Sequence, residues 1–497
     1  MGPELYCKLH FWPHMASMQI IGRTEELKTV NHALSSDKPE LVAVWGRRRV
    51  GKTFLIRHGR PQDTDWYFEL TGQRDGKQKV QLEHFARALS HAFHNGISLR
   101  VPSTWEVAFS ELEKSIESLP MDGKPVTVFF DEAPWLDSRR SGFLAALEYF
   151  WNSQGTRMPR LKMFICGSAA SWIVHKIVQG KGGWHRRVTD LIRVPQFKLH
   201  EVFAYLAHQH IRLSRLDTLR LYMVLGGVPY YLAFMRRGES VSAFVNRLFF
   251  SSEAALQGEF DELFDSLFNN SAAHKQIITA IAKTKDGLTR TEISSRTKLA
   301  SGGKLTQYLD NLQESGFLEI HEPLGVRGER YWRHRPSDMF TLFHLQWLGG
   351  RSRTRSWHAI TTSPQYRSWC GHAFEIVVWN HAHSIAGALG IAKSDYTVTR
   401  ADLENTAGKA QIDLLIDVRG GAVYLFELKF CDGTFTMTRA EAEKLRLRKQ
   451  VLDTHFKGRR SIIVCLLAPE GVRENEHSKA AIDLVLEADA LFRGSGS

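Results

Sequence analysis

Cysteine is scarce in this sequence, and long hydrophobic runs are missing. Five cysteines occur in 497 residues, and no two of them form a C-x-x-C pair. An odd number of scattered thiols excludes a disulfide framework and a cysteine zinc site, and it predicts reduced cysteines in the cytoplasm. No apolar run reaches the roughly 18 residues of a membrane span, and the first residues lack a signal-peptide pattern. The sequence therefore predicts a cytoplasmic protein without a membrane partner.

Acidic residues are too few to balance the basic ones. Lysine and arginine total 65, aspartate and glutamate total 53, and the formal net charge is +12. Such an excess favours a polyanionic partner, with DNA or RNA as the first candidate. The hydrophobic fraction of 43% is that of a globular protein, and the length predicts about two to four domains.

One glycine-rich stretch fits the phosphate-binding pattern G-x-x-x-x-G-K-[ST] at every position. The stretch consists of Gly46, Arg47, Arg48, Arg49, Val50, Gly51, Lys52 and Thr53. It follows the apolar run 41–45 and opens an amphipathic segment, which predicts strand, loop and helix in that order. Backbone N–H groups of such a loop surround phosphate oxygens, Lys52 reaches the β- and γ-phosphates, and the Thr53 hydroxyl binds Mg²⁺. The prediction is ATP binding, and the alternative is a chance match.

A second apolar run, 126–130, ends in the acids Asp131 and Glu132. Because parallel strands place their carboxyl ends at one edge of a sheet, we expect both acids beside the glycine loop. Asp131 is then predicted to hold the Mg²⁺ shell and Glu132 to polarise the attacking water, unless this is only a solvated strand end. Ser168 follows the next apolar run and is either a sensor of the γ-phosphate or the N-cap of a helix over 169–178.

Strand-like and helix-like runs alternate through this part of the chain. Strands are expected near 66–70 and 161–166, and helices near 77–93, 104–118 and 143–151. Strands separated by helices of this length predict right-handed βαβ units. The fold class is therefore α/β with a parallel sheet, and residues 1–18 are predicted to be an N-terminal extension.

The glycine loop and the two strand ends resemble those of the archaeal-type ATPases of the AAA+ class, also called DEXX-box ATP-binding proteins. The segments that carry the resemblance are 45–53, 130–136 and 166–172. The resemblance implies a P-loop ATPase core over 19–200 and a helical lid over 201–268. The segment 226–232 is similar to a glycine-x-proline element that lies near adenine, which implies a contact from Pro229. Composition alone predicts only a turn that enters a helix there.

Two consecutive arginines, Arg186 and Arg187, lie in a glycine-rich turn. In an ATPase that assembles into a homo-oligomer, such an arginine completes the ATP site of the neighbouring copy. The alternative is an ordinary solvated basic turn.

A different pattern covers 269–335. Helical runs at 275–283, 291–297 and 304–315 are followed by two strand-like runs around a glycine-bearing turn. Three helices and a β-ribbon predict a winged helix, and Lys304 lies at the start of the third helix, which enters the major groove in helix-turn-helix proteins. Winged helices also bind proteins, so both partners remain open. Residues 336–365 are expected to be a linker.

The last part of the sequence, 366–497, predicts a second chemical site. Glu427 and Lys429 share one face of a strand because side chains alternate. If residues 419–421 form the preceding hairpin loop, Asp413 lies opposite Glu427, with Cβ atoms roughly 5 Å apart. Two carboxylates at that separation are able to share a divalent cation, while Lys429 stabilises a pentavalent phosphate.

This arrangement resembles the PD-(D/E)xK nuclease superfamily, and the region resembles the nuclease-like domain that accompanies archaeal-type ATPases. The resemblance implies a restriction-endonuclease-like α/β domain, in which Glu375 on the first helix is an additional metal ligand. One departure is Gln411-Ile412-Asp413, which lacks the proline of the superfamily pattern. The alternative is an inert nuclease fold that binds DNA through a basic face. Its residues are Lys444, Arg446, Arg448 and Lys449.

Together these patterns predict an ATPase joined through a winged helix to a metal-dependent DNA nuclease, with ATP and Mg²⁺ as cofactors and DNA as partner. The nucleotide state is expected to control assembly or DNA processing, and by analogy a role in defence or repair fits. The competing interpretation is a nucleotide-dependent switch that oligomerises and binds DNA or a protein without cutting. A helicase or translocase, with ATP turnover stimulated by DNA, is a third.

Overall fold

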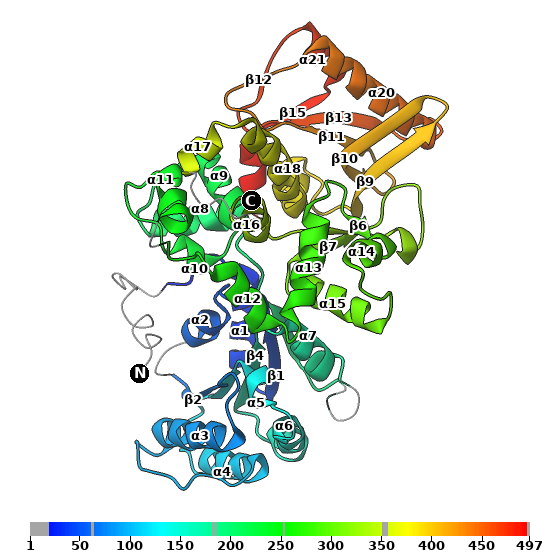
Figure 1. Cartoon of the computed structure of the whole chain (residues 1–497). Coiled ribbons are helices and arrows are strands. Elements are labelled where there is room, and N and C mark those ends of the chain that lie inside the picture. The colour runs from blue at the N-terminus through cyan, green and yellow to red at the C-terminus, as the bar shows by residue number, and fades with distance from the viewer. Residues whose placement is uncertain are drawn as a thin grey trace. The chain divides into compact units, whose positions relative to one another are not determined.

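The apolar run before the glycine loop forms strand β1, Glu40–Trp45, in which every side chain is buried. It pairs in parallel with β4, Leu161–Gly167, on one side and with β5, Asp190–Arg193, on the other. Strand β3, Val126–Asp131, pairs with β4 and with β2, Trp66–Thr71. The predicted parallel sheet is therefore present, in the order β2-β3-β4-β1-β5. Figure 1 labels β1, β2 and β4 of this sheet. Strand β5 was not predicted, because four residues with one buried side chain carry too little periodicity.

The computed structural model describes residues 19–60, 64–180, 184, 186–251, 254–349 and 356–494. The chain forms two compact units. The first holds the parallel sheet and comprises the chain up to residue 45, 51–167 and 172–194; the second comprises 46–50, 168–171 and the chain from residue 195 onward. The predicted N-terminal extension, 1–18, lies outside the described residues. None of the described helices has both the length and the apolar character that crossing a membrane requires.

Aromatic rings pack the helices of the first unit against one another. The Trp105 ring lies 4.9 Å from Phe143, and Phe109 stacks 5.4 Å from Phe150, so α4 and α6 share one core. The helices and helical turns of this part of the chain are α1 Thr24–Ser35, α2 Lys52–Gly59, α3 Gln78–Phe93, α4 Trp105–Glu117, α5 Ala133–Leu136, α6 Phe143–Ser153, η2 Gly155–Arg157, α7 Ala170–Trp172 and η3 Ile173–Val178.

The residues predicted to form a helical lid are helical. They form α8 Leu199–His208, α9 Arg215–Leu225, α10 Pro229–Leu232, α11 Val241–Val245, η4 Asn246–Phe250 and α12 Glu259–Leu267. The turn that enters α10 requires glycine at position 227, since a Cβ there would lie 1.8 Å from the Phe197 carbonyl oxygen. The Phe197 N–H donates to the Gly227 carbonyl at 2.7 Å, which fixes the start of α10.

Three helices and a small antiparallel sheet follow in the second unit, as the sequence pattern predicts. The helices are α13 Ser271–Ala282, α14 Arg290–Thr297 and α15 Gly303–Glu314, and the strands are β6 Leu288–Thr289, β7 Leu318–His321 and β8 Arg333–Pro336, in the order β6-β8-β7. The helical turn η5, Glu329–Tyr331, lies between β7 and β8.

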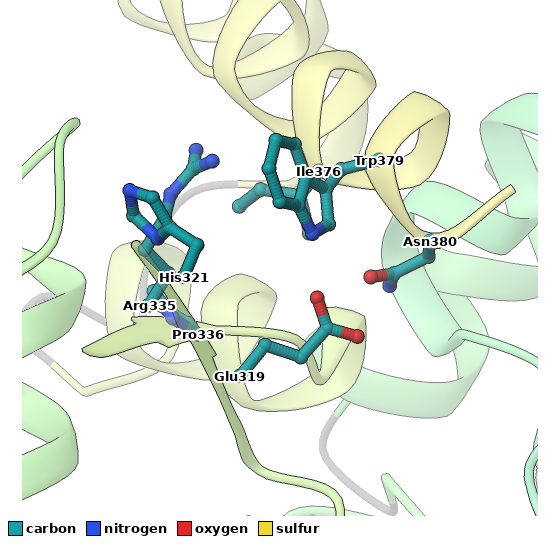
Figure 2. A pocket seen from close by; sticks show the side chains of 7 residues that line it. All are labelled: Glu319, His321, Arg335, Pro336, Ile376, Trp379 and Asn380. Atoms are coloured by element: carbon teal, nitrogen blue, oxygen red, sulfur yellow. The ribbon is translucent and has the colours of Figure 1, made fainter. Parts of the chain in front are cut away.

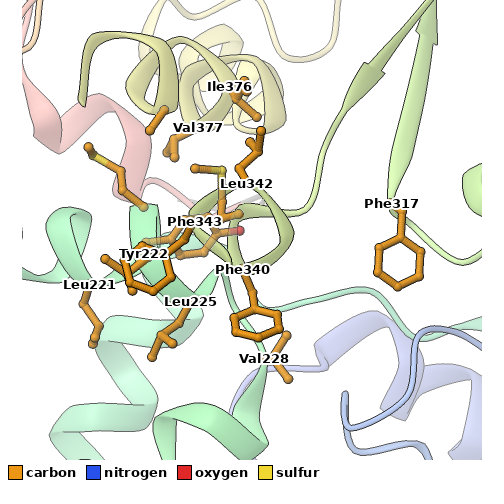
Figure 3. Close-up of a cluster of buried hydrophobic side chains, with 14 of the residues drawn as sticks. Leu221, Tyr222, Leu225, Val228, Phe317, Phe340, Leu342, Phe343, Ile376 and Val377 are labelled. Atoms are coloured by element: carbon orange, nitrogen blue, oxygen red, sulfur yellow. The ribbon is translucent and has the colours of Figure 1, made fainter. Parts of the chain in front are cut away.

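The segment predicted as a linker contains two helices instead, α16 Met339–Trp347 and α17 Trp357–Thr361. Phe340 and Phe343 of α16 are fully buried among side chains of α9 and of α18, Pro364–Asn380 (Figure 3). The prediction was wrong because α16 is apolar around most of its circumference. Such a helix has no amphipathic period, which is typical of complete burial.

The C-terminal region is built on a five-stranded sheet with the order β15-β13-β11-β10-β9. Strands β9, β10 and β11 are antiparallel neighbours, while β11, β13 and β15 run parallel. Its elements after α18 are α19 Ala382–Ala388, β9 Tyr396–Asn405, β10 Gly408–Val418, β11 Val423–Leu428, β12 Phe435–Thr436, α20 Arg439–His455, β13 Ile462–Leu467, β14 Val472–Arg473, α21 Glu476–Ala481, β15 Leu484–Leu486 and η6 Ala488–Phe492.

His381, directly after α18, connects that helix to α8 through a fully buried imidazole. Its Nε2 accepts a hydrogen bond from the Leu199 N–H at 3.0 Å, and its Nδ1–H donates to the Val377 carbonyl at 2.7 Å. This arrangement requires the neutral ring, because a proton on Nε2 would displace the Leu199 N–H. Burial, aided by the Lys198 charge, lowers the pKa of His381 to about 3.

The free energy of unfolding is therefore expected to decrease as the pH is lowered from about 6.5 to about 3. In that window the unfolded chain binds a proton at this histidine and the folded chain does not, so the free energy of unfolding falls by up to about 1.4 kcal/mol per pH unit. Urea unfolding from pH 7 to pH 4 measures this, and His381→Asn should give a shallower dependence than the unmodified protein. Equal slopes for the two proteins would contradict the prediction.

Candidate functional site

The glycine loop connects β1 directly to the first turn of α2. Gly51 precedes that helix with φ +94°, a backbone conformation that side-chain-bearing residues rarely adopt. Lys52 is buried and Thr53 is half-buried at the start of α2. The local geometry is thus the predicted strand, glycine loop and helix N-terminus, an arrangement that favours anion binding.

The predicted magnesium ligands of this site lie together in the first unit. The Thr53 hydroxyl donates to Asp131 Oδ2 at 2.8 Å, although β4 separates the strand that ends at Asp131 from β1. Burial raises the pKa of Asp131, while the Thr53 hydrogen bond and the Lys52 charge lower it. A hydroxyl and a carboxylate side by side next to a phosphate loop fit Mg²⁺, which takes oxygen ligands.

Glu132 has an unusual backbone conformation between β3 and α5. Its φ of +46° lies in the left-handed region, and its N–H donates to Asp131 Oδ1 at 3.0 Å. Gly72 packs so closely that a Cβ there would lie 2.5 Å from the Glu132 carbonyl oxygen. A non-glycine residue held in this region stores strain, which is typical of functional positions. The geometry is compatible with the predicted water-polarising role of Glu132.

Arg47 points away from the glycine loop into the core of the second unit. The side chain is 3% exposed and forms an ion pair with Asp338, which is 0% exposed. The guanidinium lies 5.2 Å from the Phe317 ring centroid, and its Nη2 donates to the Tyr231 hydroxyl at 3.5 Å. Arg47 therefore holds the loop in place by its side chain, a role that the sequence motif did not predict.

Arg49 is the second side-chain anchor of this loop. Its φ of +71° is left-handed, and its guanidinium pairs with Glu259 and lies 4.3 Å from the Tyr230 ring centroid. The Tyr231 hydroxyl donates to the same glutamate at 2.6 Å. Three arginines in a row were the signal that acidic partners exist elsewhere, but the sequence could not identify these partners because they lie far along the chain.

The other predicted nucleotide residues lie at different points of the fold. Ser168 directly follows β4 and is buried, and Pro229 is the first residue of α10. Arg186 and Arg187 are both exposed, and Arg186 has φ +57°. The suggested roles of these residues, a γ-phosphate sensor, an adenine contact and an arginine supplied to a neighbouring copy, stay predictions.

The hairpin between β10 and β11 has the predicted three-residue loop. The Val418 N–H donates to the Ala422 carbonyl at 3.1 Å, and Leu414 pairs with Phe426. The pairing with β11 is recorded from Leu414 to Asp417, and the pairing of β10 with β9 shifts register between Ile412 and Leu415, the stretch that holds Asp413. Lys429 Nζ lies 3.1 Å from Glu427 Oε1, so this acid and this lysine lie on the same face, as predicted.

The predicted metal site is not formed by these acids, and this part of the sequence prediction needs correction. No group of three or more His, Cys, Asp or Glu side chains within the described ranges is arranged to hold a metal ion. Arg400 of β9 lies between Glu375 and Asp413, at 3.2 Å and 2.9 Å from their carboxylate oxygens. Glu427 instead forms ion pairs with Lys429 and Arg448. The donor set therefore does not fit a divalent cation, because arginine and lysine already compensate the acids.

Charges in this region also act on the neighbouring side chains. Burial, followed by the nearby Asp413 charge, raises the pKa of Glu375. Burial and the surrounding cations lower the pKa of His372 to about 4, and burial together with Arg400 lowers the pKa of Arg335 to about 9. His372 is therefore neutral near pH 7 and is not a cation at this site.

The predicted DNA contacts lie on two helices of the second unit. Lys304 is exposed in the first turn of α15, and Lys444 is exposed on α20. Arg448 is only half-exposed, because its guanidinium is paired with Glu427. We therefore expect Lys304 and Lys444, rather than Arg448, to be available to a phosphate backbone.

A small cavity lies where β7 and β8 meet α18. Figure 2 shows Arg335 and His321 on one side and Trp379 and Asn380 on the other, with Glu319 below them. Its volume of about 10 Å³ is roughly enough for one water molecule, so neither a base nor a phosphate fits. The cavity is therefore not a candidate active site.

Comparison with known proteins agrees with the geometry of the glycine loop. Residues 20–235 match a family described as the ATPase domain predominantly from Archaea. The matched residues contain the predicted loop, both acids, Ser168 and Pro229.

One curated relative and two solved structures show how far the likeness extends. An uncharacterized protein of Methanocaldococcus jannaschii is 25% identical over 333 residues, 66% of this chain and 68% of its own length. A Walker-type ATPase of Pyrococcus abyssi is similar in structure, with a TM-score of 0.49 and 19% identity over 67% of this chain and 98% of the other. The ORC2 protein of Aeropyrum pernix, solved in ADPNP-ADP complexes, has a TM-score of 0.43 and 15% identity over 69% of this chain and 96% of the other.

Proposed function

We propose that the protein binds and hydrolyses ATP and that its nucleotide state controls its binding to DNA. The observation that carries this proposal is the hydrogen bond between Thr53 and Asp131, with Lys52 close enough to act on the same carboxylate. These are the residues that a P-loop enzyme needs at the β- and γ-phosphates.

The proposed roles follow from the geometry. Backbone N–H groups of residues 46–51 bind the phosphates, Lys52 neutralises the β- and γ-phosphate oxygens, and Thr53 and Asp131 hold Mg²⁺. When bound, Mg²⁺ supplies charge neutralisation of the phosphate oxygens. Glu132 accepts a proton from the water that attacks the γ-phosphorus, and ADP leaves. We also propose a homo-oligomer, in which the exposed Arg186 or Arg187 approaches the ATP of a neighbouring copy.

DNA is the proposed partner because of the net charge of +12 and the exposed lysines of α15 and α20. The element order from α13 to β8 supports a winged helix, whose third helix is α15. Fluorescence anisotropy with labelled duplex DNA tests this proposal in the presence of ATP, ADP or no nucleotide. The affinity should differ between nucleotide states in the unmodified protein and not in Lys52→Ala. Affinity that is independent of nucleotide would contradict the switch.

Lys304→Ala is expected to weaken DNA binding by about 3- to 10-fold and to reduce the dependence of log affinity on log salt by about 1, because one phosphate contact is lost. The same titration at several salt concentrations measures both quantities. Lys28→Ala, an exposed lysine on α1, is the matched control and should change neither. An unchanged salt slope for Lys304→Ala would exclude this residue from the DNA interface.

For the C-terminal domain we propose DNA binding without cleavage. The competing function is metal-dependent cleavage of DNA, and the position of Glu427 and Lys429 on one strand face favours it. The ion pairs of Arg400 and Arg448 favour the non-cutting function, because they compensate the acids that would bind metal. A plasmid assay in Mg²⁺ or Mn²⁺, with and without ATP, separates the two. We expect intact plasmid; nicking that is lost in Lys429→Ala would establish a nuclease.

A further inference from the structure

A single arginine joins two of the three acids predicted to bind metal in the C-terminal domain. Arg400 lies on β9 and is 5% exposed. Its Nη2 donates to Asp413 Oδ1 at 2.9 Å and to Glu375 Oε2 at 3.2 Å, and its Nε donates to the Asp413 carbonyl at 2.8 Å. The guanidinium is therefore fixed by three hydrogen bonds between a helix and two strands.

Two cationic side chains lie among the acids predicted to bind metal. Glu375 also pairs with Lys285 Nζ at 2.8 Å, and Arg400 Nη1 lies 3.5 Å from Asp286, so Arg400 and Lys285 face three carboxylates. A divalent metal takes several oxygen ligands that carry net negative charge, and it would have to displace the buried guanidinium of Arg400.

The loop between α13 and β6 lies over the same acids. It contributes Lys285, whose carbonyl accepts from Arg400 Nη1 at 3.3 Å, and Asp286, which accepts from Gln411 Nε2 at 2.7 Å. Both loop residues are about half exposed, at 51% and 54%. The loop thus connects helices α13–α15 to β9, β10 and α18 beside Glu375 and Asp413, two of the predicted metal ligands.

We propose that the Arg400 guanidinium occupies the position of a divalent metal between Glu375 and Asp413. Lys285 supplies a second positive charge, through its ion pair with Glu375. The carboxylates then serve to dock the loop 283–287 onto the C-terminal sheet and not to activate water. This inference deepens the proposed non-cutting function. It is tested by metal binding alone, so its failure and the failure of the function are distinguishable.

The experiment measures Mn²⁺ binding to the nucleotide-free full-length protein by the loss of the free Mn²⁺ signal in electron paramagnetic resonance. The unmodified protein and Asp413→Asn are expected to bind Mn²⁺ identically, because Asp413 is not a metal ligand. Arg400→Gln should gain a site at least about tenfold tighter than any in the unmodified protein, since Glu375 and Asp413 lose their shared cation. The gained site should vanish in the double variant Arg400→Gln/Asp413→Asn.

Arg419→Gln is the matched control, because this arginine pairs with Asp395 beside the same sheet but is 85% exposed; it should gain nothing. A Mn²⁺ site in the unmodified protein that is lost in Asp413→Asn would overturn the inference, even if plasmid DNA stays intact. A folded Arg400→Gln that gains no site would overturn it too. If Arg400→Gln does not fold, the comparison of the unmodified protein with Asp413→Asn decides alone: equal binding supports the inference and lost binding refutes it.

Discussion

Replacing Glu132 with glutamine is expected to lower the rate of ATP hydrolysis by about 100- to 1,000-fold while ATP remains bound. The amide keeps the size of the side chain but cannot accept a proton from water, and general-base catalysis contributes roughly 10²- to 10⁴-fold in enzymes. Steady-state phosphate release measures the turnover, and equilibrium binding of a fluorescent ATP analogue measures the affinity. We expect the turnover rate to fall by this factor and the nucleotide affinity to change by less than about threefold.

The backbone conformation of Glu132 supports this prediction. The residue follows Asp131 in the chain, but its left-handed backbone and the close packing of Gly72 set it apart from an ordinary strand end. Glu117→Gln, an exposed glutamate on α4, is the matched control and should hydrolyse ATP at the unmodified rate. Undiminished hydrolysis by Glu132→Gln would remove this residue from the catalytic assignment and leave Asp131 as the remaining acid at the loop.

Local signals made much of the fold predictable. The glycine loop, the apolar runs before it and the acidic strand end each depend on a few consecutive residues, and all of them are where the sequence placed them. The register of β10 and β11 was predictable because Arg419-Gly420-Gly421 is a short loop with φ +72° at Gly420, and the loop length fixes the pairing. The short strand β5 and the apolar helix α16 lacked such signals.

The partners in the buried ion pairs could not be predicted from the sequence. Arg47 and Asp338 are 291 residues apart, and Arg400 meets Glu375 across different elements. A carboxylate at the right register looks identical whether its partner is a metal or a guanidinium, and only the packed structure tells the two apart. The predicted pairing of Asp413 with Glu427 therefore stays a prediction, while the structure places Arg400 between Asp413 and Glu375.

Asp338→Asn is expected to lower the free energy of unfolding of the second unit by about 3 to 5 kcal/mol, because it removes the main counter-charge of the buried Arg47 guanidinium. Asp338 is fully buried and accepts hydrogen bonds from Gln196 at 2.9 Å and from the Thr341 N–H and hydroxyl at 3.0 and 2.6 Å, besides its ion pair with Arg47. It therefore fixes both the glycine loop and the N-terminus of α16. Urea unfolding followed by tryptophan fluorescence measures the loss.

The double variant Arg47→Met/Asp338→Asn separates this ion pair from the other contacts of the aspartate. Once the guanidinium is gone, no buried charge is left unpaired, so at least about half of the lost stability should return. Asp432→Asn, which removes an 86% exposed partner of Arg220, should cost less than about 0.5 kcal/mol. A cost below about 1 kcal/mol for Asp338→Asn, or strict additivity in the double variant, would mean that the loop is held by its backbone and not by Arg47.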